Sequence, residues 1–157
     1  MRIETVMIVH QSPKILLGMK KVNFGKGKYN GFGGKVEDDE SLYECAIRET
    51  FEEAGITVIN PIKLGTILCE FEEEGETEHV IYFYKATEFK GEPIETEEMK
   101  PEWFDEDKIP YDKMWDTDRY WMSFLLNNRK FIGYFKFDKD NKIINHIFKS
   151  YYKGELI

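Results

Sequence analysis

A run of 23 residues, from Gly34 to Ile56, constrains the fold of this chain more than any other stretch. It starts in a glycine-rich turn and continues as GKVEDDESLYECAIRETFEEAGI, which predicts a carboxylate-rich helix that ends at Gly55. Three glutamates in the helix are spaced i, i+3 and i+4. At about 100° per residue they share one helical face, which therefore carries three clustered negative charges. These residues are Glu49, Glu52 and Glu53.

The opposite face of this helix is expected to pack on a core. Its residues are Tyr43, Ile47, Thr50, Phe51 and Ala54. Like charges at helical spacing repel one another, so the glutamate cluster costs stability unless something binds it. A divalent cation reverses that effect, because Mg²⁺ takes oxygen ligands and commonly uses a few carboxylates together with substrate phosphates. Taken alone, the spacing also fits a solvated acidic face.

The glutamates belong to a longer pattern with nine fixed places. The pattern is Gly34, five residues, Glu40, seven residues, and then Arg48-Glu49-x-x-Glu52-Glu53-x-Gly55-Ile56. It resembles the Nudix box, G-x5-E-x7-R-E-U-x-E-E-x-G-U, in which U is a bulky aliphatic residue, and eight of the nine places match. The departure is Thr50, which is nearly isosteric with valine and is expected to affect packing and not chemistry.

The resemblance to the Nudix family covers nearly the whole chain and is strongest to the MutT-type branch that hydrolyses oxidised purine nucleoside triphosphates. The similar segments outside the box are LLGMKK (16–21), Asn23-Phe24-Gly25, YNGFGGKV (29–36), Glu98–Pro101 with Trp103-Phe104, Pro110–Trp115 and Phe131–Phe137. The resemblance implies a single Nudix domain over residues 1–157, folded as an α/β/α sandwich with a mixed twisted sheet and two main helices. Strands and helices that interleave without regular βαβ repeats favour the same class.

The pattern of elements along the chain is expected to be as follows. Strands are predicted over 3–10, 14–21, 57–72, 78–89, part of 92–106, 130–137 and 142–149, with a loop over 22–31, a charged turn over 73–76 and a second helix, irregular at its start, over 111–127.

The family resemblance implies hydrolysis of a nucleoside triphosphate to the monophosphate and pyrophosphate with Mg²⁺, or alternatively Mn²⁺. The implied metal ligands are Gly33 and Gly34 (through a backbone carbonyl), Glu49, Glu52, Glu53 and Glu98. The metal would neutralise charge on phosphoryl oxygens and activate a water, and Glu52, Glu53 or Glu98 would take the proton. Arg48 is expected to orient a carboxylate by a forked hydrogen bond, and Glu40 to pair within the box.

A second set of residues, also implied by the resemblance, would bind the base. These residues are Lys20, Phe24, Asn30, Trp115, Thr117 and Asp118. The related enzymes carry two adjacent aspartates, one of them protonated; Asp118 matches the second and Thr117 replaces the first. A hydroxyl can donate or accept, so recognition of the same base, or of another purine, is consistent with this change.

Other pocket positions also depart from the family. By ungapped count, Cys69 and Glu78 stand where the related pocket has phenylalanine and methionine, which leaves the exact base open. Phe24 and Trp115 are expected to flank the base, with core packing as the alternative. Trp103 and Trp121 are assigned to the core, and a solvated strand end is the alternative for Lys20.

Charge is unevenly distributed along the chain. The formal net charge is −8, which argues against polymeric nucleic acid as a partner. Residues 1–35 nevertheless sum to +6, which leaves −14 for the remainder. A basic segment beside an acidic helix suits a polyphosphate substrate, although solvated lysines are the alternative. Two cysteines indicate neither a disulfide framework nor a zinc site, no apolar run is long enough to span a membrane, and a cytoplasmic monomer is expected.

The sequence therefore predicts a Mg²⁺-dependent Nudix pyrophosphohydrolase that acts on an oxidised purine nucleoside triphosphate such as 8-oxo-dGTP and cleans the nucleotide pool. One alternative is a Nudix hydrolase for another modified purine triphosphate or a dinucleoside polyphosphate. The other is a nucleotide-binding sensor without catalysis, which predicts damage to the Glu49, Glu52 and Glu53 set. That set is intact.

Overall fold

A nine-stranded mixed sheet forms the centre of the molecule in the computed structural model, which describes residues 1–72 and 77–152. Its strands are β1 (Arg2–Gln11), β2 (Lys14–Lys20), β3 (Tyr29–Asn30), β4 (Phe32–Lys35), β6 (Ile62–Phe71), β7 (Glu78–Ala86), β9 (Met99–Asp105), β10 (Lys130–Phe137) and β11 (Ile143–Tyr151). The order is β11-β10-β6-β7-β1-β2-β3, with β4 also paired to β1 and β9 to β2. Strands β1 and β7, and β6 and β10, run parallel, while the other pairs are antiparallel.

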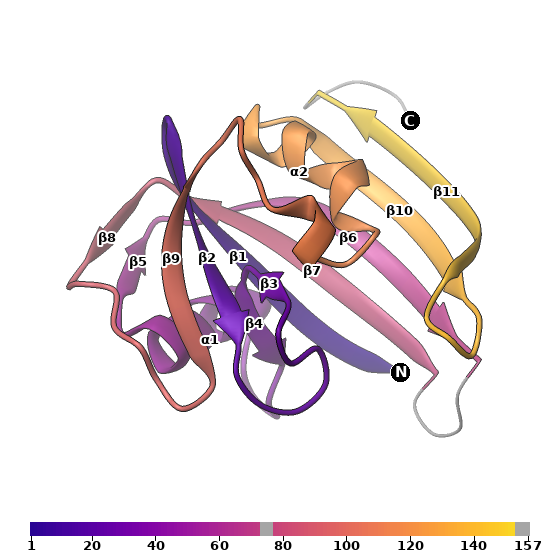
Figure 1. The fold of residues 1–157 in the computed structure, drawn as a ribbon, viewed down its shortest axis with the longest axis horizontal. Helices are drawn as coiled ribbons and strands as arrows, with labels where there is room; N and C mark the ends of the chain where they lie inside the picture. The colour runs from indigo at the N-terminus through magenta and orange to yellow at the C-terminus, as the bar shows by residue number, and fades with distance from the viewer. Residues whose placement is uncertain (73–76, 153–157) are drawn as a thin grey trace.

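The alternation of side chains along the strands supplies a core on each face of the sheet. Met7 and Val9 of β1 face a cluster that includes Ala46 and Ala54 of α1 (Leu42–Ala54). Ile8, between them, faces the cluster that contains residues of α2 (Asp118–Leu126). Figure 1 shows α2 in front of β10, with which it is in contact. The α/β/α sandwich predicted from the sequence is therefore confirmed.

The strands differ from the prediction at three places. The run 57–72 is two strands, β5 (Thr57–Ile59) and β6, because Asn60 has φ 49° and is followed by a proline. The run 78–89 ends at Ala86, and β8 (Glu88–Lys90) pairs with β5 in a small separate sheet. The predicted loop 22–31 contains the two-residue strand β3, and the predicted turn 73–76 lies outside the described residues.

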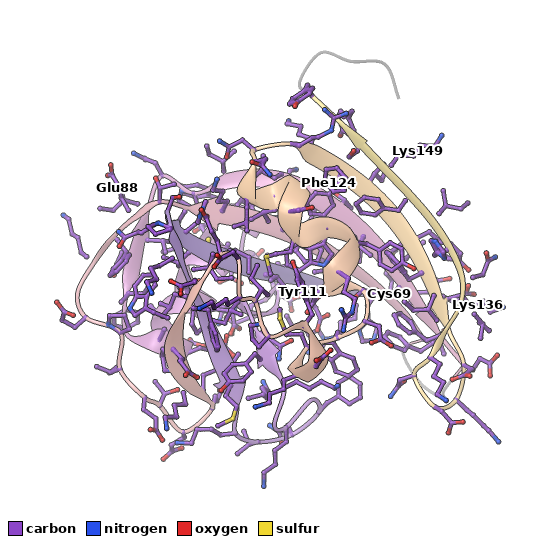
Figure 2. All side chains as sticks on the ribbon, turned by 45° about the horizontal axis from the view of Figure 1, so that its top comes forward. Cys69, Glu88, Tyr111, Phe124, Lys136 and Lys149 are labelled. Atoms are coloured by element: carbon purple, nitrogen blue, oxygen red, sulfur yellow. The ribbon has the colours of Figure 1, made fainter. Side chains whose placement is uncertain are left out.

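The other elements agree with the sequence. The first helix ends at the αL residue Gly55, and the final hairpin pairs β10 with β11. The irregular start predicted for the second helical region is a 3₁₀ turn, Tyr111–Lys113, ahead of α2. Figure 2 labels Tyr111 in this turn, Phe124 on α2 and Cys69, which belongs to the same buried cluster as α2.

The buried face of α1 is rotated from the expected one. Tyr43 and Phe51 were expected in the core but are 42% and 56% exposed. The buried residues are Cys45, Ala46, Thr50, Glu53 and Ala54. Small side chains let the helix lie close to β4 and β1, which leaves the large aromatic residues at its margins. Thr50 is fully buried, and its hydroxyl donates to the Ala46 carbonyl at 2.7 Å, so its polar group is satisfied within the helix.

Candidate active site

The caps of α1 fix the position of its glutamates. The Ser41 hydroxyl accepts from the Glu44 N–H at 3.0 Å, and the Glu44 carboxylate accepts from the Ser41 N–H at 3.2 Å. This capping box starts the helix, and Gly55, with φ 74°, ends it. The local sequence therefore fixes where α1 begins and ends, and with it the direction in which each of its side chains points.

Arg48 donates hydrogen bonds to three glutamates, one ahead of α1 and two within it. Its Nε and Nη2 donate to the two oxygens of Glu40 at 2.5 and 3.0 Å, which is the forked bond expected from the sequence. Its Nη1 donates to Glu49 at 2.9 Å and to Glu52 at 3.1 Å. These hydrogen bonds from Arg48 hold the pKa of Glu40 down at about 2. Arg48 therefore orients carboxylates in this structure.

The three clustered glutamates lie in different environments, although they share one helical spacing. The Glu49 side chain is 14% exposed and that of Glu52 is 51% exposed. Glu53 is only 1% exposed, and its Oε1 accepts from the Gly33 N–H at 2.7 Å. The idea of three carboxylates on one solvent-facing surface is therefore wrong, because the helix turns Glu53 toward β4.

Burial raises the pKa of the Glu53 carboxyl to about 8, although the Gly33 N–H and the Lys20 ammonium act in the opposite direction. The negative charges of Glu49 and Glu98 raise it further. Burial likewise raises the pKa of Glu49, and the charges of Glu52 and Glu98 add to this effect. Glu98 comes from the segment before β9, so the structure brings it within electrostatic range of α1.

Gly33 and Gly34 provide close backbone approach. A Cβ on Gly34 would lie 2.6 Å from the Glu49 carboxyl carbon, and one on Gly33 would lie 1.7 Å from the Thr5 carbonyl oxygen. The Gly34 carbonyl has a protein neighbour, the Cys45 Sγ at 3.7 Å. Gly34 can therefore lie against Glu49, and Gly33 against the Thr5 backbone of β1, only because neither residue has a side chain.

The oxygen donors fit a hard divalent cation, but they are not gathered as a ready-made site. Among the described residues, no three acidic, histidine or cysteine side chains converge tightly enough to hold a metal ion. Arg48 engages Glu49 and Glu52, and Gly33 engages Glu53. All candidate donors are carboxylate or carbonyl oxygens, which is the ligand set that Mg²⁺ and Mn²⁺ take.

A cavity of about 420 Å³ opens on the α2 side of the sheet and reaches the Glu53 end of α1. Nine residues predicted to form the site line it: Lys20, Phe24, Asn30, Gly33, Gly34, Glu53, Trp115, Thr117 and Asp118. Arg48, Glu49, Glu52 and Glu98 lie outside the lining. The lining of the cavity therefore includes Lys20 and Glu53 together with the proposed base-reading residues.

The Asp118 carboxyl is the buried acid of this cavity, 8% exposed. Burial raises its pKa to about 7, although Trp121, Trp115 and Lys28 act in the opposite direction. It therefore keeps a proton up to near neutral pH and can donate a hydrogen bond. Thr117 precedes it at the N-cap of α2 but makes no side-chain capping bond. Asn30 donates from Nδ2 to the Lys28 carbonyl at 3.3 Å, which orients its amide.

Two aromatic rings flank the cavity. Phe24 stacks on Trp115 with ring centroids 5.1 Å apart, and the Lys28 ammonium lies 4.9 Å from the Trp115 ring centroid. Phe24 is 63% exposed, so the alternative of core packing is wrong for it. Trp121 is buried as expected and also lines the cavity. Trp103 was assigned to the core but is 37% exposed on β9.

Several lining residues were not identified from the sequence. They are Arg2, Glu4, Thr5, Val6, Gly31, Phe71, His79, Ile81, Phe83, Met99 and Phe137. Cys69 lines the cavity as the count suggested, but the neighbour of Glu78, His79, lines it instead of Glu78. Successive residues of a strand face opposite sides, so a count displaced by one residue selects the wrong side chain. The alternation within β7 carried the signal, because His79, Ile81 and Phe83 share one face.

Comparison with known proteins gives consistent matches. A family model described as "NUDIX domain" matches residues 1–125. The chain is 46% identical over 143 residues to the "Oxidized purine nucleoside triphosphate hydrolase" of Danio rerio, with 90% of each chain covered. It is 42% identical over 145 residues to the protein of the same name from Mus musculus, with 92% of each covered. The crystal structure of a MutT protein from Bacillus halodurans superposes with a TM-score of 0.84 at 30% identity, covering 95% of this chain and 98% of that one.

Proposed function

The chain belongs to the Nudix family, and we propose that it hydrolyses an oxidised purine nucleoside triphosphate, such as 8-oxo-dGTP, to the monophosphate and pyrophosphate. It is a Nudix hydrolase, and the similar proteins of Danio rerio and Mus musculus are named for this class of substrate. Such an enzyme removes damaged nucleotides before a polymerase can use them.

The observation that carries the proposal is the composition of the cavity. It joins a cationic and carboxylate part, Lys20 with Glu53, to a part with base-reading groups, Asn30 and Asp118. Lys20 would attract phosphates, and its positive charge acts on Glu53, where it lowers the pKa against the effect of burial. One cavity of about 420 Å³ is of the size that takes a small-molecule ligand. A triphosphate attached to a purine satisfies both parts.

Nudix hydrolases generally use divalent metals, and we propose Mg²⁺ here, with Mn²⁺ as a substitute. The residues that would hold it are Glu49, Glu52, Glu53 and Glu98 with the backbone at Gly33 and Gly34. When bound, it would stabilise charge on the phosphoryl oxygens and make a water more acidic.

The chain's own residues supply the rest of the chemistry. Arg48 holds Glu49 and Glu52 in position through Nη1. Glu52 is assigned the proton-acceptor role, because its half-exposed carboxylate is open to water, whereas Glu53 is buried against Gly33. Glu53 and Glu98 are the other candidates for this role.

The base would lie beside Phe24 and Trp115 and be read by three polar groups. The Asp118 carboxyl, which keeps its proton up to near neutral pH, can donate. The Asn30 amide can donate and accept, and the Thr117 hydroxyl can do either. A protonated acid is suited to a carbonyl oxygen or a ring nitrogen acceptor of an altered purine. This arrangement retains one acid of the family's aspartate pair.

Pyrophosphate release, measured with Mg²⁺ across 8-oxo-dGTP, 2-hydroxy-dATP and the unmodified dNTPs, tests this proposal. We expect kcat/KM for an oxidised purine at least about a hundredfold above dGTP, a difference of about 2.7 kcal/mol in transition-state binding. Glu52→Gln should remove most turnover and retain nucleotide binding. Equal activity across the panel would refute the oxidised-purine assignment. Absence of turnover in the wild type, with nucleotide binding that Glu52→Gln leaves unchanged, would favour the non-catalytic sensor.

A second candidate, hydrolysis of a different modified purine nucleotide, is favoured by the charged end of the cavity. There Arg2 donates to Glu4 at 2.7 Å, and the His79 ring nitrogen lies 3.5 Å from the same carboxylate. These charged groups lie next to Cys69, so the cavity is polar at this end and is not lined by apolar side chains alone. Higher activity on a purine triphosphate with a modification other than oxidation, added to the panel, would support this candidate.

We propose one domain for this activity, since β10 and β11, beyond the part matched as a Nudix domain, pair into the same sheet. A cytoplasmic monomer acting on free nucleotides fits two cysteines that are both free and buried. No helix among residues 1–72 and 77–152 is long and apolar enough to cross a membrane.

A further inference from the structure

We propose that Thr96 is a positioning residue whose hydroxyl sets Glu98 relative to the glutamates of α1. The inference rests on the proposed function, because the place of Glu98 matters only if these carboxylates act together on a metal. It concerns the segment between β8 and β9, residues 91–98, which the sequence pattern identifies only through Glu98.

A single hydroxyl links the two parts of the site. Thr96 Oγ1 donates to the Glu53 carbonyl at 3.0 Å and accepts from the Met99 N–H at 3.2 Å. The Thr96 N–H donates in turn to the Met99 carbonyl at 2.9 Å. Residues 96 to 99 thus form a closed turn around Glu98, and the hydroxyl fastens that turn to the backbone of Glu53 itself.

The same segment caps the end of α1. The last carbonyls of a helix have no partner within it. Here the Ala54 carbonyl accepts from the Ile94 N–H at 2.9 Å, and the Glu53 carbonyl accepts from Thr96. The Ile94 side chain lies over Gly55, where a Cβ would approach it to 2.5 Å. Two successive backbone carbonyls of the catalytic helix therefore depend on this segment.

Lys21 holds the segment from the other side. Its N–H donates to the Glu98 carbonyl at 2.8 Å. Its Nζ donates to the Thr96 carbonyl at 2.8 Å and to the Glu95 carboxylate at 2.6 Å. Lys21 follows Lys20, which lines the cavity, so the turn is tied both to α1 and to the end of β2.

These contacts determine where Glu98 lies, because its own side chain is exposed and is not packed in a core. Its charge nevertheless reaches both Glu49 and Glu53. The backbone turn, and not side-chain packing, therefore places this carboxylate. Loss of the Thr96 hydroxyl should let the turn move away from α1, and small displacements of ligands are costly at such sites.

The experiment compares Thr96→Val, which keeps the shape and removes the hydroxyl, with Thr96→Ser, which keeps the hydroxyl. Mn²⁺ binding to the metal-free protein is measured by electron paramagnetic resonance, and activation by Mg²⁺ is measured at saturating nucleotide. We expect Thr96→Val to weaken Mn²⁺ binding and to raise the half-activating Mg²⁺ concentration, each by about tenfold, the scale of one hydrogen bond. Thr96→Ser should stay within about twofold of the wild type.

Two further variants separate positioning from folding. Thr57→Val makes the same replacement at an exposed position of β5 and should change neither measurement. Lys21→Met removes the ammonium that holds the Thr96 carbonyl and should act in the same direction as Thr96→Val, which keeps the inference testable if Thr96→Val unfolds. Thermal unfolding of each variant reports the purely structural effect.

Glu98→Gln, with Glu97→Gln as its matched control, separates this inference from the proposed function. Weaker Mn²⁺ binding in Glu98→Gln but not in Thr96→Val or Lys21→Met would overturn the positioning role alone. Unchanged binding in Glu98→Gln would remove Glu98 from the metal set and the inference with it. Equal losses in Thr96→Ser and Thr96→Val would also overturn it, because the hydroxyl would then not be the group responsible.

Discussion

Glu53 should make the metal-free protein less stable as the pH rises. Its carboxyl is 1% exposed, and burial raises its pKa from 4.5 to about 8. Because the pKa is higher in the folded protein than in the unfolded chain, the stability it contributes is fully present below about pH 4.5 and is lost as the pH rises through about 8. With about 1.4 kcal/mol for each pKa unit, the loss between pH 5 and pH 9 is about 4 kcal/mol.

Glu53→Gln removes this ionisation and keeps an oxygen that accepts from the Gly33 N–H. The free energy of unfolding is measured by urea denaturation in EDTA from pH 5 to pH 9, for the wild type and the variant. The difference between the two curves isolates Glu53 from Asp118, whose pKa is also raised. We expect the variant to gain stability relative to the wild type as the pH rises.

The matched control is Glu52→Gln, the same change on the same helix at a side chain that is 51% exposed. Its curve should run nearly parallel to that of the wild type. Parallel curves for Glu53→Gln as well would refute the reasoning, because they would mean that the buried carboxyl ionises as readily in the folded protein as in the unfolded chain. Saturating Mg²⁺ should reduce the pH dependence of the wild type, since a bound cation favours the ionised carboxylate.

Two other predictions follow from the same geometry. Arg48→Lys keeps the charge but cannot form the fork on Glu40, so urea denaturation should show a loss of about 1 to 2 kcal/mol and kcat should fall more than KM changes. Asp118→Asn should remove the fall in kcat/KM for an oxidised purine that we expect in the wild type as the pH rises through about 7, because the protonated acid is the donor. A variant profile that still falls near pH 7 would show that another group is titrating.

Much of the site could be predicted because its determinants are local in sequence. The capping box at Ser41 and the αL residue Gly55 fix α1, and the spacing within the box then fixes the Arg48–Glu40 pair. The division of side chains between the two faces of the sheet could also be predicted from the sequence, because alternation along β1 and β2 needs no tertiary information. For these features, short-range geometry leaves few alternatives.

The wrong predictions arise where a sequence pattern groups residues on one face of a helix or strand but does not show what that face packs against. Helical periodicity grouped Tyr43 with Phe51, yet nothing in the sequence says that the small residues, and not the large ones, meet the sheet. An ungapped count across the residues between β6 and β7 selected Glu78, whereas His79 lines the cavity. Trp103 is apolar but partly exposed, because its strand, β9, pairs with β2 outside the main strand order of the sheet.

The roles of the three glutamates show why spacing alone cannot finish the assignment. Residues 49, 52 and 53 are chemically identical and adjacent on one helix, but packing buries one against Gly33, shields another beside Arg48 and leaves the third open to water. Ionisation, metal binding and proton transfer depend on those surroundings. Thr96 is a residue that the sequence patterns do not identify at all. It belongs to no recognised pattern, and its importance follows only from a bond to the carbonyl of a residue 43 positions earlier. Motifs therefore identify the groups that carry chemistry, while contacts between distant segments decide which task each group can perform.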